Sequence, residues 1–333
     1  MKRSGGDFGT VFLDVTDILH WPLPQLTGIQ RTTVGILKAL MEEAIAYQLV
    51  AFSGSGRFEI VELNSLPKPV LMMLPLPKKS PLDTDSDLIT IPLRSKLYQS
   101  WSKLFRGKGI PPVFFGLARR VFRVLWTSRK RESGVPAILT SGDIFWSLGA
   151  GWSNLEWSHG VSALFKRNIK VIRLVYDLIP AIKPQWVRRQ DSHAFELWLS
   201  EIFNFSSGIA TISEFSRKEI VNYAKSNRLS LPPVKVLRLG DEMVKPMDSG
   251  SRPGLSSSGT PFFVCVSTLD IRKNHRLIYS AWQVLLERRG ADCPDVLLIG
   301  TRHLLVDDLL WEISNDPCLN SKVILKTDLT DDE

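Results

Sequence analysis

The stretch Phe262–His275 constrains the fold of this chain more than any other. It opens with a run of aromatic and β-branched residues, Phe262–Val266, which predicts a fully buried β-strand. Small polar residues follow, and Asn274 is placed to cap a helix that the pattern predicts over His275–Arg289. The expected apolar face of this helix consists of Leu277, Ala281, Val284 and Leu285. A strand, a turn and a helix in direct succession predict an α/β domain with the turn at the carboxyl end of a strand.

Two adjacent cations, Arg272 and Lys273, lie in this turn. The amides and dipole of a helix N-terminus attract anions, while Arg adds a planar fork for phosphate oxygens and Lys adds a point charge. The pattern therefore predicts a diphosphate-binding turn, with Ser267 beside it. The alternative is a solvated Arg-Lys pair in an ordinary loop, because the stretch lacks the glycines of a P-loop or a dinucleotide fingerprint.

The sequence STLDIRKNH, starting at Ser267, is followed by a helix and by a strand that ends in LLIG at Gly300. This succession resembles the start of the C-terminal domain in glycosyltransferase family 4. Members of that family are retaining, metal-independent enzymes of the GT-B fold, in which two Rossmann-like domains face a cleft. The resemblance implies that Arg272 and Lys273 hold the diphosphate of a nucleotide-sugar donor. It also makes Ser267 and Gly300 candidates for the cleft.

A second part of the resemblance lies near the N-terminus, where a strand predicted over Thr10–Val15 is followed by a helix that runs to about Ala46. The sequence DVTDIL…TGIQR resembles the opening of bacterial mannosyl- and rhamnosyltransferase-like members of the family. This implies that Gly28 and Arg31 lie across the cleft from the donor, with Gly28 allowing close approach of the backbone. The alternative is that Gly28 simply permits a turn.

Two further segments carry the resemblance. YDLIPAIKPQW, starting at Tyr176, is similar to the family's His-Asp-Leu-Ile-Pro segment with Tyr in place of the common His, and ATISEFSRKEI resembles a serine-rich helix start that faces the cleft. The resemblance implies a catalytic or acceptor-side role for Asp177 and a cleft position for Ser213. The alternatives are that Asp177 caps the following turn and that Ser213 is the N-cap of a helix.

Strand and helix patterns alternate along most of the 333 residues, enough for two domains. The sequence predicts an α/β, GT-B-like architecture with an N-terminal acceptor-side Rossmann-like domain over 1–240, which carries a basic helical insertion at about 66–135. A linker over 241–260 and a partial nucleotide-sugar-binding domain over 261–333 follow. Other predicted strands are Gln48–Ser53, Phe58–Leu63, Asp143–Leu148, Lys170–Tyr176, Gly208–Ser213, Val234–Leu239, Val296–Gly300 and Lys322–Leu325, and other predicted helices are Asp191–Phe203 and His303–Ile313.

The second predicted domain is incomplete, because a Rossmann-type domain has about six strands and the pattern predicts three. The family's donor-binding segment carries two glutamates separated by seven residues, and this sequence has no such pair. The resemblance thus implies either a fragment or a truncated, inactive protein.

The net charge of +8 is concentrated in one segment: residues 94–132 carry eleven Lys and Arg against Glu132 alone, so the rest of the chain sums to −2. Two amphipathic helices are predicted there, Arg94–Arg106 and Pro112–Lys130, and their cations and aromatic residues suit an anionic membrane surface. The alternative is a helical insertion that packs on the N-terminal domain with its charges in water. No nucleic-acid partner is expected, because no helix-turn-helix, zinc-finger or RNA-recognition signature is present.

The three cysteines, Cys265, Cys293 and Cys318, lack metal-ligand spacing and favour reduced thiols in a cytoplasmic protein. Asp14 and Asp17 interrupt the first apolar run, which argues against a signal peptide. No apolar stretch approaches the roughly 20 residues of a transmembrane helix. The sequence therefore predicts a cytoplasmic protein, with peripheral attachment to the inner face of the plasma membrane through the basic segment.

The resemblance to family 4 implies a retaining glycosyltransferase of surface-polysaccharide biosynthesis. The expected donor is a nucleoside-diphosphate sugar, GDP-mannose by analogy, and the expected acceptor is a glycan or a lipid-linked sugar. No metal or other cofactor is expected, because Arg272 and Lys273 neutralise the charge that grows on the leaving diphosphate. The alternative is a catalytically inactive or fragmentary GT-B-like protein that binds a membrane or a partner protein.

Overall fold

The computed structural model of the chain describes residues 9–19, 26–54, 56–75, 135–240, 261–319 and 321–327, together with residue 329. The chain divides into two compact units: the first contains the part up to residue 182 and residues 190–240, and the second contains residues 183–189 and the part from residue 241 onward. Each unit has its own sheet and its own core. The predicted basic segment 94–132 and the predicted linker 241–260 lie outside the described residues.

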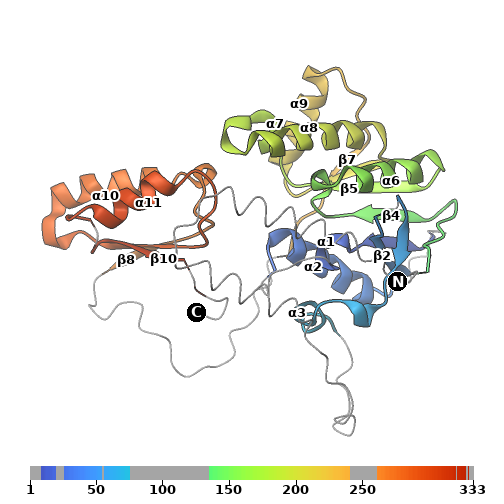
Figure 1. Cartoon of the computed structure of the whole chain (residues 1–333), viewed down its shortest axis with the longest axis horizontal. Helices are drawn as coiled ribbons and strands as arrows, with labels where there is room; N and C mark the ends of the chain where they lie inside the picture. Colours follow the sequence, from blue (N-terminus) through green and yellow to red (C-terminus); the bar gives the residue numbers. More distant parts are fainter. Residues whose placement is uncertain are drawn as a thin grey trace, which may run out of the picture. The chain divides into compact units, whose positions relative to one another are not determined.

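The first unit is built on a seven-stranded sheet with the strand order β3-β2-β1-β4-β5-β6-β7 (Figure 1). All neighbouring strands are parallel except β2 and β3, which are antiparallel. The chain leaves β1 toward β2 and returns on the other side of β1 as β4, so the strand order reverses between β1 and β4. Doubly wound sheets bind ligands at the carboxyl ends of the strands near such a reversal. The strands are β1 Val11–Asp14, β2 Tyr47–Phe52, β3 Phe58–Ile60, β4 Ile144–Ser147, β5 Lys170–Val175, β6 Gly208–Thr211 and β7 Val234–Val236.

Helices cover both faces of this sheet. α6, α8 and α9 pack on one face around buried residues such as Phe145 and Ile202, and α1, α2 and α3 pack on the other around Leu13 and Leu37 (Figure 1). Val70 of α3 is fully buried in the second of these cores, so the start of the predicted insertion belongs to the domain core. Every helix within the described ranges is too short or too polar to cross a bilayer. The helices are α1 Thr16–Leu19, α2 Gly28–Glu42, α3 Lys68–Leu71, α6 Leu155–Lys166, α7 Ile179–Ile182, α8 Arg189–Asn204 and α9 Glu214–Ser226.

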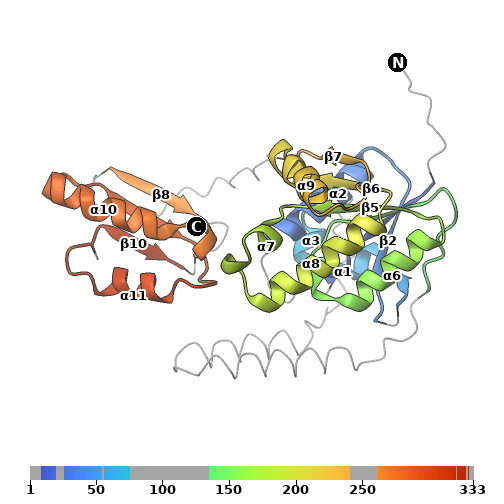
Figure 2. The ribbon, with the colours of Figure 1, turned by 90° about the horizontal axis from the view of Figure 1, so that it is seen from above.

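The second unit is a three-stranded parallel sheet with the order β10-β9-β8, and α10 and α11 lie on the same side of it (Figures 1 and 2). Its core joins Tyr279 and Trp282 of α10 to Leu309 and Ile313 of α11 and to Leu298 of β9. The elements are β8 Phe262–Val266, α10 His275–Arg289, β9 Asp295–Ile299, α11 Asp307–Asn315 and β10 Val323–Lys326.

Two predictions about burial in this unit are wrong. β8 was expected to be fully buried, yet Phe263 is 58% exposed and Val266 is 73% exposed, because β8 has one neighbour among the described strands and the described helices cover one face of the sheet. The inner face of α10 is formed by Tyr279 and Trp282. Leu285, from the predicted face, packs against this core, whereas Leu277 is 64% exposed.

A third prediction, the helix His303–Ile313, is wrong at its start. α11 begins at Asp307, and the residues before it form a loop that hydrogen-bonds with the turn after β8. The other predicted strands and helices that the structure describes are confirmed within a few residues of their predicted ends.

Gly300 directly follows β9 and has a conformation that favours glycine, with a φ of 151°. A Cβ atom at this position would lie 1.9 Å from the carbonyl oxygen of Ser267. The absence of a side chain therefore lets the backbone after β9 approach the backbone after β8, which places the two loops side by side.

We predict that Gly300→Ala lowers the free energy of unfolding by about 1–3 kcal/mol, because the new side chain meets backbone that cannot move without opening the loop. Gly35→Ala in α2 is the control: a Cβ at Gly35 meets no atom within 4 Å. We expect Gly35→Ala to raise stability by about 0.5–1 kcal/mol. Urea unfolding followed by tryptophan fluorescence measures both, and an unchanged midpoint for Gly300→Ala would contradict the prediction.

Candidate functional site

The predicted site residues form two groups, one in each unit. The group in the second unit lies at the carboxyl ends of β8 and β9 and contains Ser267, Arg272, Lys273 and Gly300. The group in the first unit lies near helix starts and strand ends and contains Gly28, Arg31, Asp177 and Ser213.

The turn after β8 is ordered by its own side chains. A single 3₁₀ turn, Ile271–Lys273, precedes α10, and the Asp270 carboxylate accepts a hydrogen bond from the backbone N–H of Arg272 at 3.0 Å. Asn274 has a φ of 51°, a conformation that Asn adopts more readily than most residues, and its side chain makes no capping hydrogen bond to α10. The predicted side-chain cap is therefore wrong, while the position of Arg272 and Lys273 directly before the helix is confirmed.

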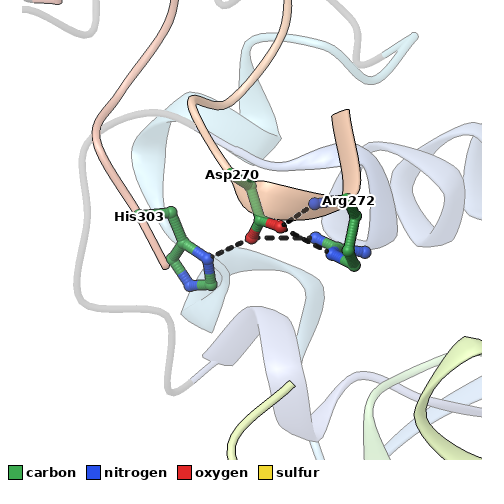
Figure 3. A network of polar contacts seen from close by, with 3 residues as sticks. All are labelled: Asp270, Arg272 and His303. Carbon is green, nitrogen blue, oxygen red and sulfur yellow. Dashed lines mark hydrogen bonds and ion pairs between the residues drawn. The ribbon is translucent and has the colours of Figure 1, made fainter. Parts of the chain in front are cut away.

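The Asp270 carboxylate is the centre of a polar network with Arg272 and His303 (Figure 3). Its Oδ1 atom accepts a bond from Arg272 Nε at 3.0 Å, and its Oδ2 atom lies 3.4 Å from Arg272 Nη2. His303 Nδ1 lies 2.6 Å from Oδ2. One carboxylate thus orients both a guanidinium and an imidazole.

Backbone hydrogen bonds bring the two loops of this network together. Leu269 donates to the carbonyl of Thr301 at 2.9 Å, and His303 donates to the carbonyl of Leu269 at 2.9 Å. A third bond runs from Ile271 to the carbonyl of Leu304 at 3.1 Å. The loops extend the pairing of β8 with β9, so His303 is fixed beside Asp270 by the backbone as well as by its side chain. Sequence reasoning missed His303, because the residue was assigned to a helix.

The charges in this network are unevenly buried. Burial of Asp270 favours its neutral form, but hydrogen bonds from Arg272 and His303 outweigh that effect and hold the pKa of Asp270 below its ordinary value. Asp270 is therefore an anion at neutral pH, and its side chain has no exposed surface. The Arg272 side chain is 31% exposed and Lys273 is exposed. An oriented guanidinium with an accessible edge, beside a lysine, can bind an anion.

Ser267 is engaged with a buried histidine. Its Oγ atom lies 3.0 Å from Nε2 of His275, the first residue of α10. Burial lowers the pKa of His275, which keeps the imidazole neutral. The hydroxyl of Ser267 therefore helps to attach the start of α10 to the end of β8.

In the first unit, Asp177 and Ser213 have the structural roles that the sequence offered as alternatives to a site role: Asp177 caps a turn, and Ser213 is the N-cap of a helix. Oδ1 of Asp177 accepts a hydrogen bond from the backbone of Ile179 at 3.0 Å, which caps the turn after β5. Ser213 is the N-cap of α9 and accepts a bond from the backbone of Ser216 at 3.0 Å. The hydroxyl of Ser216 donates to the carbonyl of Tyr176 at 3.0 Å, so the ends of β5 and β6 lie together.

Gly28 and Arg31 lie in the first turn of α2, and both are exposed. A Cβ at Gly28 would meet no atom within 4 Å, so the packing of the described residues does not require glycine there. Arg31 Nε donates to the carbonyl of Leu26 at 3.1 Å. Thr32 hydrogen-bonds with the hydroxyl of Tyr176, which joins the start of α2 to the end of β5.

Asp14 is the last residue of β1, beside the reversal of strand order. It was not identified from the sequence as a site residue. It is 6% exposed and accepts bonds from Trp157 Nε1 at 2.8 Å and from the backbone of Thr16 at 3.0 Å. Burial raises the pKa of Asp14 to about 6, although these bonds work in the opposite direction. The signal in the sequence was a carboxylate at the very end of an apolar strand.

A second missed carboxylate, Asp17, lies in α1 and accepts a bond from the backbone N–H of Ala150. Burial raises its pKa as well. A Cβ at Gly149 would lie 2.2 Å from an oxygen of Asp17, so this glycine lets the loop after β4 close on the carboxylate. The Tyr176 hydroxyl donates to the carbonyl of Leu148 at 3.0 Å, and burial raises its pKa to about 12, so the phenol stays neutral.

Behind Asp14, Trp157 separates two buried charges. The guanidinium of Arg173 lies 5.8 Å from the centre of the Trp157 ring, and burial lowers the pKa of Arg173 to about 10. Arg173 is 1% exposed, and its guanidinium nitrogens have no hydrogen-bond partner among the described residues. A ring face attracts a cation and the indole N–H donates to an anion, so Trp157 stabilises both.

The carboxylates and hydroxyls at this edge can hydrogen-bond with the hydroxyl groups of a sugar. Within the described ranges, no three His, Cys, Asp or Glu side chains cluster in a way that could hold a metal ion.

We predict that the buried Asp14 makes stability depend on pH. Its pKa is raised in the folded chain, so the folded state binds a proton more tightly than the unfolded state, and stability falls as the pH rises from about 4 to about 6. The free energy of unfolding of the wild type, relative to that of Asp14→Asn, should therefore fall by up to about 3 kcal/mol over this window. Urea unfolding at several pH values measures the difference, and a constant difference would contradict the prediction.

Comparison with known proteins gives relatives in both sequence and structure, although no family model matches the chain. Over 170 residues the chain is 23% identical to the serotype-specific mannosyltransferase WbdA of Escherichia coli, which covers 48% of this chain and 21% of that protein. A second WbdA sequence from Escherichia coli is 21% identical over 171 residues. The match thus spans about a fifth of the length of these relatives.

Among solved structures, the trehalose-6-phosphate synthase OtsA has a TM-score of 0.51 at 15% identity, and the alignment covers 97% of this chain and 74% of OtsA. The structure of TarM aligns with a TM-score of 0.40 at 11% identity over 57% of this chain and 33% of that chain, which is too low to support an argument about the fold. The predicted α/β fold with parallel sheets is confirmed, and the chain is similar in fold to OtsA, a GT-B glycosyltransferase, and in sequence to the mannosyltransferase WbdA.

Proposed function

We propose that this protein is a retaining glycosyltransferase that transfers a sugar from a nucleoside-diphosphate sugar to a glycan or lipid-linked acceptor in surface-polysaccharide biosynthesis. The observation that carries the proposal is the turn Asp270–Lys273, which holds an oriented guanidinium and a lysine at the carboxyl end of a parallel strand. The fold of glycosyltransferases and the sequence relation to a mannosyltransferase support the same reaction class. GDP-mannose is the proposed donor, because the WbdA relatives are named mannosyltransferases.

The proposed donor contacts are Arg272 and Lys273, with Ser267 and Gly300 shaping the turn. As the bond between the sugar and the diphosphate breaks, negative charge grows on the leaving oxygen. Fixed cations at that point stabilise the transition state more than the ground state. Two side-chain cations can take the role that a divalent metal has in other transferases, so we propose that neither metal nor cofactor is required.

The proposed acceptor contacts are in the first unit. Asp177 is the proposed catalytic or acceptor-side carboxylate: its Oδ1 is used in capping, and the residue is only partly buried. Gly28, Arg31 and Ser213 are proposed as further contacts, because they lie at the start of α2 and α9, where carboxyl ends of parallel strands meet helix starts.

Nucleotide binding tests the donor site. We expect GDP to bind in isothermal titration calorimetry and Arg272→Ala to weaken binding about 10- to 100-fold, because the loss of charge-assisted hydrogen bonds to phosphate costs about 1.5–3 kcal/mol. Arg288→Ala, at the far end of α10, is the matched control and should bind as wild type does. Titration with UDP in place of GDP tests which nucleotide base the site prefers. Titration with GDP in the presence of EDTA or of Mg²⁺ tests whether binding requires a metal ion.

The same protein incubated with GDP-mannose and a mannose-terminated oligosaccharide tests the reaction, and an α-configured product in NMR spectra indicates retention. No nucleotide binding at millimolar GDP or UDP would reject the donor site. Binding without transfer to any mannose-terminated acceptor would favour the alternative of an inactive GT-B-like binding protein.

We also propose that the protein is cytoplasmic and attaches to anionic membrane through residues 94–131, which lie in the segment 94–132 with its net charge of +10. Each Lys or Arg near an anionic surface contributes about 1 kcal/mol, and salt screens this attraction. We predict co-flotation with phosphatidylserine liposomes at low salt and release at about 0.5 M salt. Neutral liposomes are the control, and no co-flotation at low salt would reject the attachment.

A further inference from the structure

His303 uses one of its two ring nitrogens within the chain. Nδ1 lies 2.6 Å from Asp270 Oδ2, and the side chain is 55% exposed. Figure 3 shows the other ring nitrogen, Nε2, on the side of the ring away from Asp270. Among the described residues, Nε2 has no recorded hydrogen-bond partner. His303 therefore combines a fixed orientation with an accessible nitrogen.

The chemistry of Asp270 decides which nitrogen of His303 carries a proton. The ionised carboxylate can only accept hydrogen bonds, so Nδ1 must be the donor. Nε2 is then a lone-pair acceptor when the ring is neutral and an N–H donor when the ring is protonated. Histidine changes charge between about pH 5 and 8, so a small change in its surroundings decides between the two forms.

The charged groups around His303 come from both loops and from α11. Asp270 places a negative charge beside the ring, and Arg272 and Lys273, from the same turn, carry two positive charges. Arg302, the preceding residue, pairs with Asp307 of α11 at 2.6 Å, which offsets its charge, and Asp308 follows in the same helix turn. With a neutral His303, the triad Asp270–Arg272–Lys273 has a net charge of +1. An incoming diphosphate would shift the balance toward the imidazolium.

We propose that His303 is a further phosphate-binding residue that acts in its protonated form, donating from Nε2 to a diphosphate oxygen while Asp270 holds Nδ1. Binding of the diphosphate then takes up one proton from solvent, which goes to Nε2, and no other bond changes. The inference rests on the proposed function and adds to it a residue and a dependence on pH. It makes donor binding tighter as the pH falls.

A purely structural role for His303 is the competing explanation, since the residue joins the loop after β9 to Asp270. Two conservative variants separate the roles. His303→Asn keeps an amide donor near the position of Nδ1 and removes Nε2, so it retains the contact with Asp270 and lacks the phosphate donor. His303→Gln places an amide near the position of Nε2 but loses the contact with Asp270. His159→Asn, on the exposed side of α6, is the control for a histidine elsewhere.

Calorimetric titration with GDP and with inorganic pyrophosphate tests the proposal on the full chain at pH 6, 7 and 8, in two buffers with different enthalpies of ionisation. The ratio of wild-type to His303→Asn affinity should rise from near 1 at pH 8 to about 10 at pH 6, because one charge-assisted hydrogen bond is gained. This ratio cancels the titration of the ligand's own phosphate. The buffer dependence of the binding enthalpy should show that the wild type and His159→Asn take up more protons on binding than His303→Asn, and this difference excludes the protons exchanged by the ligand's own phosphate.

The outcomes separate this inference from the proposed function. Binding by wild type that Arg272→Ala weakens, with His303→Asn equal to wild type at every pH, overturns the inference and leaves the donor site in place. A pH-independent loss in His303→Asn, with a lowered thermal midpoint, assigns the residue a structural role and also overturns it. Absence of any GDP or pyrophosphate binding by wild type overturns both.

Discussion

The buried carboxylate of Asp270 is the interaction on which the candidate donor site depends. It has no exposed side-chain surface, so its charge must be compensated within the protein, and Arg272, His303 and the backbone of Arg272 supply that compensation. Removal of one partner from such a network leaves a buried charge without its counter-charge, which costs more than the hydrogen bond is worth. The orientation of Arg272 is thus a consequence of the need to stabilise Asp270. A guanidinium held in this way loses little conformational entropy when it meets a phosphate.

Parallel pairing explains why both units place their polar groups where they do. The carboxyl ends of parallel strands lie at one edge, and the loops that leave this edge can exchange hydrogen bonds, as the loops after β8 and β9 do through Leu269 and His303. The first unit repeats the arrangement with Asp14, Asp17 and Tyr176 at the ends of β1 and β5. Most buried side chains of the strands are apolar, with exceptions such as Arg173 of β5, so the strand ends are where most of the polar groups gather.

Most helices and strands, and the turn after β8, could be predicted from the sequence, because they depend on local patterns of residues. A run of apolar residues followed by Ser, Thr and Asp marked the end of β8, and His275–Arg289 agrees with α10 at both ends. Burial was predicted poorly, because it depends on which neighbours a strand has: the same run, Phe262–Val266, would be buried between two strands and is exposed at the edge of the sheet that the described residues form. His303 was missed because the pattern placed it in a helix, and the distance in sequence hid the partners of both His303 and Asp14: Asp270 lies 33 positions from His303, and Trp157 lies 143 positions from Asp14. Such residues come together only in the folded chain, through the pairing of β8 with β9 and the packing of α6 beside β1.

The exposure of β8 does not affect the geometry of the candidate site at its carboxyl end. The backbone bonds that fix the turn go to the loop after β9, and the side-chain bonds that orient Arg272 go to Asp270 within the turn. None of these bonds uses the free side of β8 or the uncovered face of the sheet. The exposure of Phe263 and Val266 therefore affects how stable the unit is, through apolar surface left in water, at about 25 cal/mol for each Å². The geometry of the turn Asp270–Lys273 is set by two neighbouring strands and their loops, and a further strand beside β8 would leave these bonds unchanged.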